Sequence, residues 1–238
     1  MPDIYPGKDS YMRMDNESTW AGARDASSAE TVNASATNGQ IKISANGAGS
    51  QFDVYRIFMA FDTSAIGVAP SSANLVIRGY SAGTADLIVV KVASGATGDP
   101  TTNFDASDFS KIDGFVSGSS MSGNATDYSS EITTWSTSGQ NTITLNAAAL
   151  ADIASLSDFK LCLVSYDYDY LNTAISNGST VRSGMGLVSS STASYRPYLS
   201  YTEAGPSGID KVNDISKSSI LSIDSISRSS IAALDDVT

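Results

Sequence analysis

The chain has 238 residues, of which 41% are hydrophobic, so it can bury a core of one large β domain or two small domains and is not wholly disordered. Its net charge of −11 makes nucleic acid a poor partner, because phosphate binding needs a basic face, and disfavours an anionic membrane surface for the same reason. The absence of histidine and the single cysteine exclude a Ser-His-Asp triad, a Cys-His pair, an intrachain disulfide and a His- or Cys-based zinc site.

The N-terminal segment MPDIYPGKDS carries neither a basic region nor an apolar stretch, so we expect no secretory signal. No part of the chain approaches the ~20 apolar residues of a membrane-spanning helix, and we expect no membrane insertion. The protein is therefore expected to be made in a cytosol and, if it acts outside, to leave by lysis, by a dedicated machine or as part of a particle such as a virion.

Short apolar or alternating runs, bounded by Gly, Asn, Ser and Pro, predict β-strands along most of the chain. These strands are expected near residues 11–14, 41–44, 54–61, 73–80, 87–92, 141–145, 160–165, 186–188 and 198–201. One segment, 146–157, favours a helix, with Asn146 as its N-cap and Leu150 and Ile153 on one face. Many short strands with one short helix predict an all-β fold, an antiparallel β-sandwich.

The segment 56–62 alternates Ile57, Met59 and Phe61 with Phe58 and Ala60. One set should face the core, and the other should face a second layer or a partner. Asp62 follows in a turn, where its carboxylate is expected to cap backbone N–H groups. Cys162 lies in the apolar run 160–164, which predicts a small buried side chain in a strand.

The loop YDYDY at 166–170 is a candidate metal site, because Asp167 and Asp169 supply hard oxygen donors, with Asn172 nearby. The cation would be calcium, although calcium takes six to eight oxygen ligands and this loop offers three. The same loop also fits a half-buried strand end with solvated acids, or a contact with a sugar or a subunit. No other cofactor is indicated.

Trp20 and Tyr168 are candidate glycan contacts, because exposed aromatic rings stack on sugars; placement in the core or in an interface is the plainer alternative. Carboxylate pairs of the kind that cleave glycosides leave no signature in a single sequence. No motif marks such a pair here, and we expect a protein without enzymatic activity.

The C-terminal segment 209–238 repeats with a period of eleven residues. Three aliphatic positions recur in each copy, and they are the candidate assembly residues Ile209, Val212, Ile215, Ile220, Ile223, Ile226, Ile231, Leu234 and Val237. The composition of 203–208 is that of a linker, so we expect a sandwich domain over 1–202, a linker over 203–208 and an assembly segment over 209–238.

Three conformations remain open for this repeat. It could form an amphipathic helix of 3.67 residues per turn that associates with its own copies. It could alternate a helical turn with an extended piece around a partner, or order only on docking. A solvated extension is the plain alternative, but it does not account for the preserved register of the apolar positions.

Five segments, read in order, resemble the DNRLRE-like jelly-roll modules of surface and secreted proteins: GKDSYMR at 7–13, QIKIS at 40–44, RIFMAFDTSAI at 56–66, PSSANLVI at 70–77 and YRPYLSY at 195–201. The resemblance covers about four fifths of the chain. It implies a jelly-roll β-sandwich that binds carbohydrate or serves as a structural spacer.

The repeat is similar to the KVNGV repeats at the ends of structural proteins of tailed phages, especially marine ones. Those repeats usually carry Gly where this chain has Asp214, Ser225 and Asp236. Together the two resemblances imply a non-enzymatic virion protein, a capsid decoration or a head or tail fibre protein, joined to its own copies or to other virion proteins. The alternative is a carbohydrate-binding module of a surface or secreted protein, with surface glycans as partners.

Overall fold

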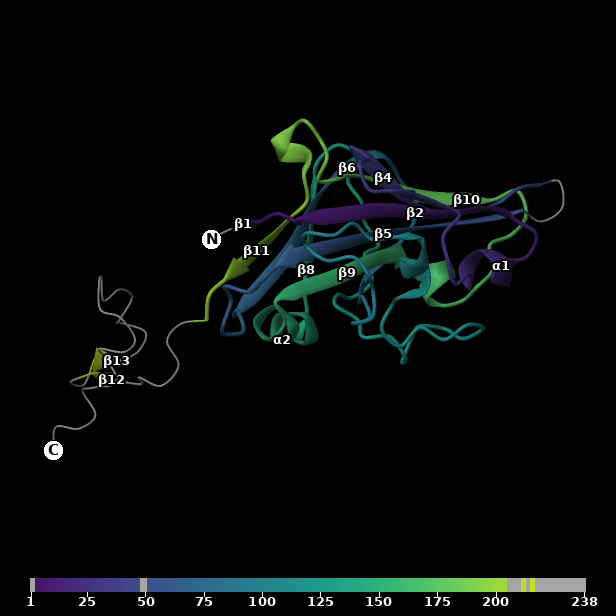
Figure 1. Cartoon of the computed structure of the whole chain (residues 1–238). Helices are drawn as coiled ribbons and strands as arrows, with labels where there is room; N and C mark the ends of the chain where they lie inside the picture. The colour runs from purple at the N-terminus through teal and green to yellow at the C-terminus, as the bar shows by residue number, and fades with distance from the viewer. Residues whose placement is uncertain (1–2, 48–50, 205–210, 213–214, 217–238) are drawn as a thin grey trace. The chain divides into compact units, whose positions relative to one another are not determined.

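The structure, a computed structural model, describes residues 3–47, 51–204, 211–212 and 215–216. The chain divides into two units, Met1–Glu203 and Ala204–Thr238. The first unit is an all-antiparallel β-sandwich with short helices, as the sequence predicts (Figure 1). Its strands are β1 (Asp3–Ile4), β2 (Lys8–Glu17), β3 (Thr31–Asn33), β4 (Asn38–Ala45), β5 (Phe52–Asp62), β6 (Ser72–Gly83), β7 (Leu87–Lys91), β8 (Gln140–Thr144), β9 (Asp158–Ser165), β10 (Thr180–Gly186) and β11 (Tyr198–Thr202).

Two layers of strands make the sandwich, and β6 belongs to both. In the smaller layer β11 lies between β1 and β6, and β6 also pairs with β8. In the larger layer the order runs from β3 through β2 to β5, whose other edge is shared by β4 and β9; β10 follows β4 and β7 follows β9. The end of β6 pairs with β10 through Gly79 and Gly83, which joins the layers.

The larger layer is buried on both faces, and two clusters of apolar side chains result. The cluster between the layers contains Leu75, Ile143 and Leu199 from the smaller layer. The cluster on the opposite face is covered by the connection from β7 to β8, which contributes Phe104 and Phe109.

The alternation predicted for 56–62 is confirmed in β5. Ile57, Met59 and Phe61 belong to the cluster between the layers, and Phe58 and Ala60 belong to the cluster on the other face. The second layer that the sequence required is thus not a partner protein but the connection between β7 and β8 and its neighbours. A strand covered on both faces has this nearly continuous apolar sequence.

The predicted helix at 146–157 is confirmed as α2 (Ala147–Ser155). The side chain of Asn146 caps it by accepting a hydrogen bond from the Ala149 N–H at 3.1 Å. Ala149 and Ile153 are buried against the cluster between the layers. Asp62 caps its turn as expected, accepting from the Ser64 N–H at 3.0 Å.

Several short elements escape the sequence patterns. The helix α1 (Trp20–Arg24) lies where a loop is expected, and its N-cap is Thr19, which accepts from the Gly22 N–H. The remaining helical turns are Ala106–Ser110, Tyr166–Tyr170 and Ala193–Tyr195. The strand expected at 186–188 is instead β10 (Thr180–Gly186), because Gly184 and Gly186 interrupt the strand pattern within it.

The second unit is described at five residues only, Ala204 and the four of a short strand pair. There β12 (Lys211–Val212) and β13 (Ile215–Ser216) form an antiparallel pair in which Val212 lies opposite Ile215. At these positions of the repeat the backbone is extended, so a continuous helix is not what the structure shows. Within the part of the chain that is described, no helix has the length and hydrophobicity to span a bilayer.

Candidate functional site

Both candidate glycan contacts, Trp20 and Tyr168, are half-buried against the cluster on the outer face of the larger layer. The Trp20 indole N–H donates to Asn172 Oδ1 at 3.0 Å, and its ring packs edge-on against Phe52 at 6.1 Å between centroids. The Trp20 ring is thus held by contacts within the protein. Both side chains pack against the apolar cluster and contribute to the fold.

The structure separates the two candidate calcium ligands. Asp169 is fully buried, and its two carboxylate oxygens accept from the Arg56 Nε and Nη2 atoms, each at 2.8 Å. The Arg24 Nε lies 3.5 Å from Asp169 Oδ1, which makes a second ion pair. The prediction that Asp169 binds calcium is therefore wrong, because its charge neutralises buried arginines; the sequence spacing of Asp167 and Asp169 could not reveal partners more than a hundred residues away.

Asp167 instead joins a different acidic group. One carboxylate oxygen of Asp167 and one each of Asp86 and Glu131 lie within 4.8 Å of one another. Desolvation, followed by the charge of Asp167, raises the pKa of Asp86, and desolvation followed by both neighbours raises the pKa of Glu131. Calcium takes six to eight oxygen ligands, and these three carboxylates are too few to complete such a site. We therefore describe the group as three surface carboxylates whose negative charges repel one another.

Of the nine candidate assembly residues, Val212 and Ile215 belong to the pair of strands β12 and β13. The other seven, Ile209, Ile220, Ile223, Ile226, Ile231, Leu234 and Val237, lie outside the described residues.

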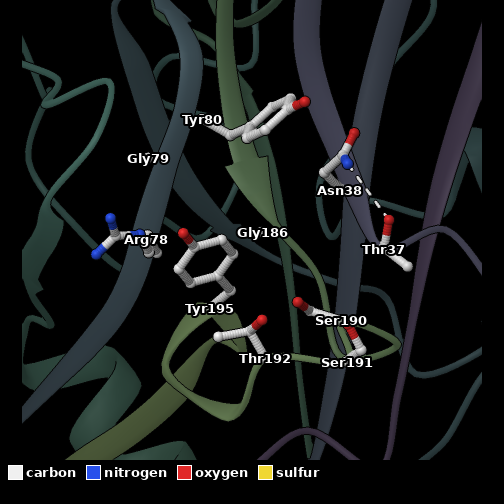
Figure 2. A pocket seen from close by; sticks show the side chains of 10 residues that line it. All are labelled: Thr37, Asn38, Arg78, Gly79, Tyr80, Gly186, Ser190, Ser191, Thr192 and Tyr195. Atoms are coloured by element: carbon white, nitrogen blue, oxygen red, sulfur yellow. Dashed lines mark hydrogen bonds between the residues drawn. The ribbon is translucent and has the colours of Figure 1, made fainter.

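A pocket of about 210 Å³ lies on the sandwich where β4, β6 and β10 are neighbours (Figure 2). The residues that line it are Thr37, Asn38, Arg78, Gly79, Tyr80, Gly186, Ser190, Ser191, Thr192 and Tyr195. One of these residues is Gly186, which follows the buried Met185 at the end of β10. A Cβ atom at Gly186 would come within 2.2 Å of the Tyr195 carbonyl oxygen, so only glycine lets the loop from β10 to β11 close over the strand.

The loop from β10 to β11 is fixed by contacts at several points. The Arg196 Nε donates to the Ser190 carbonyl at 2.9 Å, and the Val188 N–H donates to Asp9 Oδ2 at 2.6 Å. The Arg78 guanidinium lies over the Tyr195 ring, 4.5 Å from its centroid. Figure 2 shows Arg78 beside this ring, with Tyr80 on the same strand and the serines on the opposite rim. These contacts within the protein make the pocket preformed.

Chemically, the pocket offers one fixed positive charge and many hydroxyl groups. The Arg78 guanidinium supplies the positive charge, and hydroxyl and amide groups both donate and accept hydrogen bonds. The described residues that line the pocket include no carboxylate, thiol or amine side chain.

Comparison with known proteins yields no relative for this chain: no protein family matches it, and no curated protein does. Function must therefore be inferred from the geometry. The sequence patterns did not single out Arg78, Tyr80 or Tyr195. The signal present was indirect: Gly184 and Gly186 in a strand mark a close approach of other backbone.

Proposed function

We propose that this chain is a non-enzymatic structural protein of a tailed-phage virion, a capsid decoration protein or a head or tail fibre protein. The sandwich is the displayed part, and the repeat at 209–238 joins it to other copies or to other virion proteins. One observation carries the proposal: nine aliphatic positions keep an eleven-residue register after a domain whose two described apolar clusters come from Met1–Glu203.

The energetic reason for attachment is the burial of these nine side chains. At about 25 cal/mol per Å² of apolar surface, burying them contributes on the order of 10–20 kcal/mol before the loss of chain entropy is subtracted. Thirty residues cannot bury nine aliphatic side chains among themselves, and a partner surface can. The resemblance of the repeat to the KVNGV repeats of tailed phages favours a virion as the place of assembly.

Deletion of residues 209–238 tests the proposal. We expect the full chain to sediment as an oligomer or with the particle, and the truncated chain to sediment as a monomer. Its thermal unfolding should keep the midpoint of the sandwich in the full chain. A truncated protein that assembles like the full chain would contradict the proposal.

A substitution series separates the apolar register from mere tail length. Ile220, Ile223 and Ile226 are changed together to Ser, which removes one third of the apolar positions. The matched control changes Ser222, Ser225 and Ser227 to Asn in the same copy of the repeat. Assembly should weaken in the first protein and persist in the second.

A second function, glycan binding, is proposed because of the pocket in Figure 2. Exposed tyrosines beside hydroxyl and guanidinium donors are the usual means of holding a small polar ligand. Trp20 and Tyr168, which are half-buried, have no part in this proposal.

A further inference from the structure

The strongest unexplained feature of the sandwich is the guanidinium group of Arg78. Among the described residues no carboxylate forms an ion pair with it, and its recorded side-chain contact is the Tyr195 ring. This is notable in a chain that has 25 acidic and 14 basic residues. Arg78 is one of the residues that line the pocket, and none of the other lining residues carries a carboxylate.

The aromatic rings at the pocket are unusually accessible. Tyr80 is 48% exposed and Tyr195 is 37% exposed, and both are among the exposed large hydrophobic side chains of the described residues. Arg78 and Tyr80 occupy alternate positions of β6 and therefore project on the same side of the strand. A flat ligand with one apolar face can lie against such rings, as sugar rings do through their C–H groups.

The rest of the lining is dominated by hydroxyl groups. Six of the ten residues carry one, namely Thr37, Tyr80, Ser190, Ser191, Thr192 and Tyr195. The amide of Asn38 adds a further donor and acceptor, and it already donates to Thr37 Oγ1 at 3.3 Å. No aliphatic side chain of the described residues lines the pocket, so an apolar peptide side chain would find no matching surface there.

We propose that this pocket binds one acidic sugar residue of a glycan, a hexuronate unit whose carboxylate pairs with Arg78. The inference rests on the second proposed function, glycan binding, and names its substrate class. The planar guanidinium offers two parallel N–H donors that match a carboxylate, and stacking on Tyr195 holds it ready. The sugar ring lies against Tyr80 and Tyr195, and its hydroxyls bond to Asn38 and to the serines of the loop.

The size of the pocket limits the ligand to a single unit. Its volume of about 210 Å³ lies below the roughly 300–1,000 Å³ of pockets that enclose drug-sized molecules. A longer glycan would therefore place one residue in the pocket and run across the open surface on either side. Affinity for one unit should be weak and should rise when several copies of the protein are joined.

The test is a calorimetric titration of the full chain with two trisaccharides, one of galacturonic acid and one of galactose. We expect the acidic trisaccharide to bind at least tenfold more tightly, with an affinity that falls as salt is added. Arg78→Gln should weaken this binding roughly 10- to 100-fold, the range for loss of a charge-assisted hydrogen bond. Arg78→Lys, which keeps the charge but not the fork, should retain part of the affinity.

A matched control is Thr134→Ala, which changes a second surface hollow lined in part by Trp135 and Thr142. This variant should bind like the unchanged protein, and thermal unfolding of every variant shows that it is folded. Equal affinity for the two trisaccharides would overturn the acidic-sugar inference and leave glycan binding standing. Binding of an acidic peptide with no binding of either sugar would overturn both, without touching the role of the repeat.

Discussion

The buried carboxyl group of Asp9 should make the stability of the sandwich depend on pH. Asp9 lies in β2 and is 1% exposed; its Oδ2 accepts from the Val188 N–H, and its Oδ1 has no partner among the described residues. Burial raises the pKa of this group from 3.8 to about 7, and the bond from Val188 opposes the rise. In the folded protein Asp9 therefore keeps its proton up to about pH 7, whereas in the unfolded chain it loses that proton near pH 4.

The sign and size follow from this difference in pKa. Between about pH 4 and pH 7 the folded state binds more protons, so the free energy of unfolding falls as the pH rises. A shift of about three units, at 1.36 kcal/mol per unit, corresponds to about 4 kcal/mol. Below pH 4 the effect is absent, and above pH 7 it is complete.

Substitution of Asp9 by Asn removes the contribution of this carboxyl group to the pH dependence of the free energy of unfolding. The amide has the same shape, and any cost of its own unpaired N–H is the same at every pH. Other carboxylates also titrate, so the measured quantity is the difference between the two proteins in urea unfolding at pH 4 and pH 8. We expect Asp9→Asn to gain about 4 kcal/mol relative to the unchanged protein between these two values. A difference that is constant with pH would refute the assignment of this pKa.

Two further predictions concern charge. Asp169→Asn leaves the buried Arg56 without its anion and should lower the free energy of unfolding by about 3–5 kcal/mol, whereas Arg13→Gln, at a half-exposed ion pair, should change it by less than about 1 kcal/mol. Similar losses in urea unfolding for both variants would contradict the role given to Asp169. Glu131→Gln should raise the melting temperature at pH 7 and leave it unchanged at pH 4, because desolvation, followed by the charges of Asp86 and Asp167, raises the pKa of Glu131, and protonation removes this penalty on its ionised form. A lower melting temperature at pH 7 would count against repulsion in this group.

The fold was predictable because its signals are local. Alternation and turn residues located most of the long strands, and the double-sided apolar pattern at 56–62 correctly required a layer on each face of β5. The N-cap at Asn146 and the apolar face of α2 likewise depend on residues within one segment. Where small residues replace the pattern, as in SGMG of β10, the position of the strand was wrong by several residues.

The candidate sites were less predictable because they depend on contacts between distant segments. Asp169 looked like a metal ligand beside Asp167, yet its partner Arg56 lies 113 residues away. Trp20 was a candidate glycan contact, with placement in the core or an interface as the plainer alternative, and the residue that accepts from its N–H, Asn172, lies 152 residues away. Neither partner can be inferred from the spacing within YDYDY or from the composition around Trp20.

The glycines of β10 are the residues of the sequence that best indicate where the pocket lies. In a strand that must pack, a missing side chain weakens the sheet unless another part of the chain takes the space. At Gly184 that part is the Tyr80 carbonyl, 1.9 Å from where a Cβ would lie, and at Gly186 it is the Tyr195 carbonyl. The two glycines thus indicate which backbone segments meet, and those segments carry the exposed tyrosines. Arg78, two positions before Tyr80 and stacked on Tyr195, gives the same meeting point its charge.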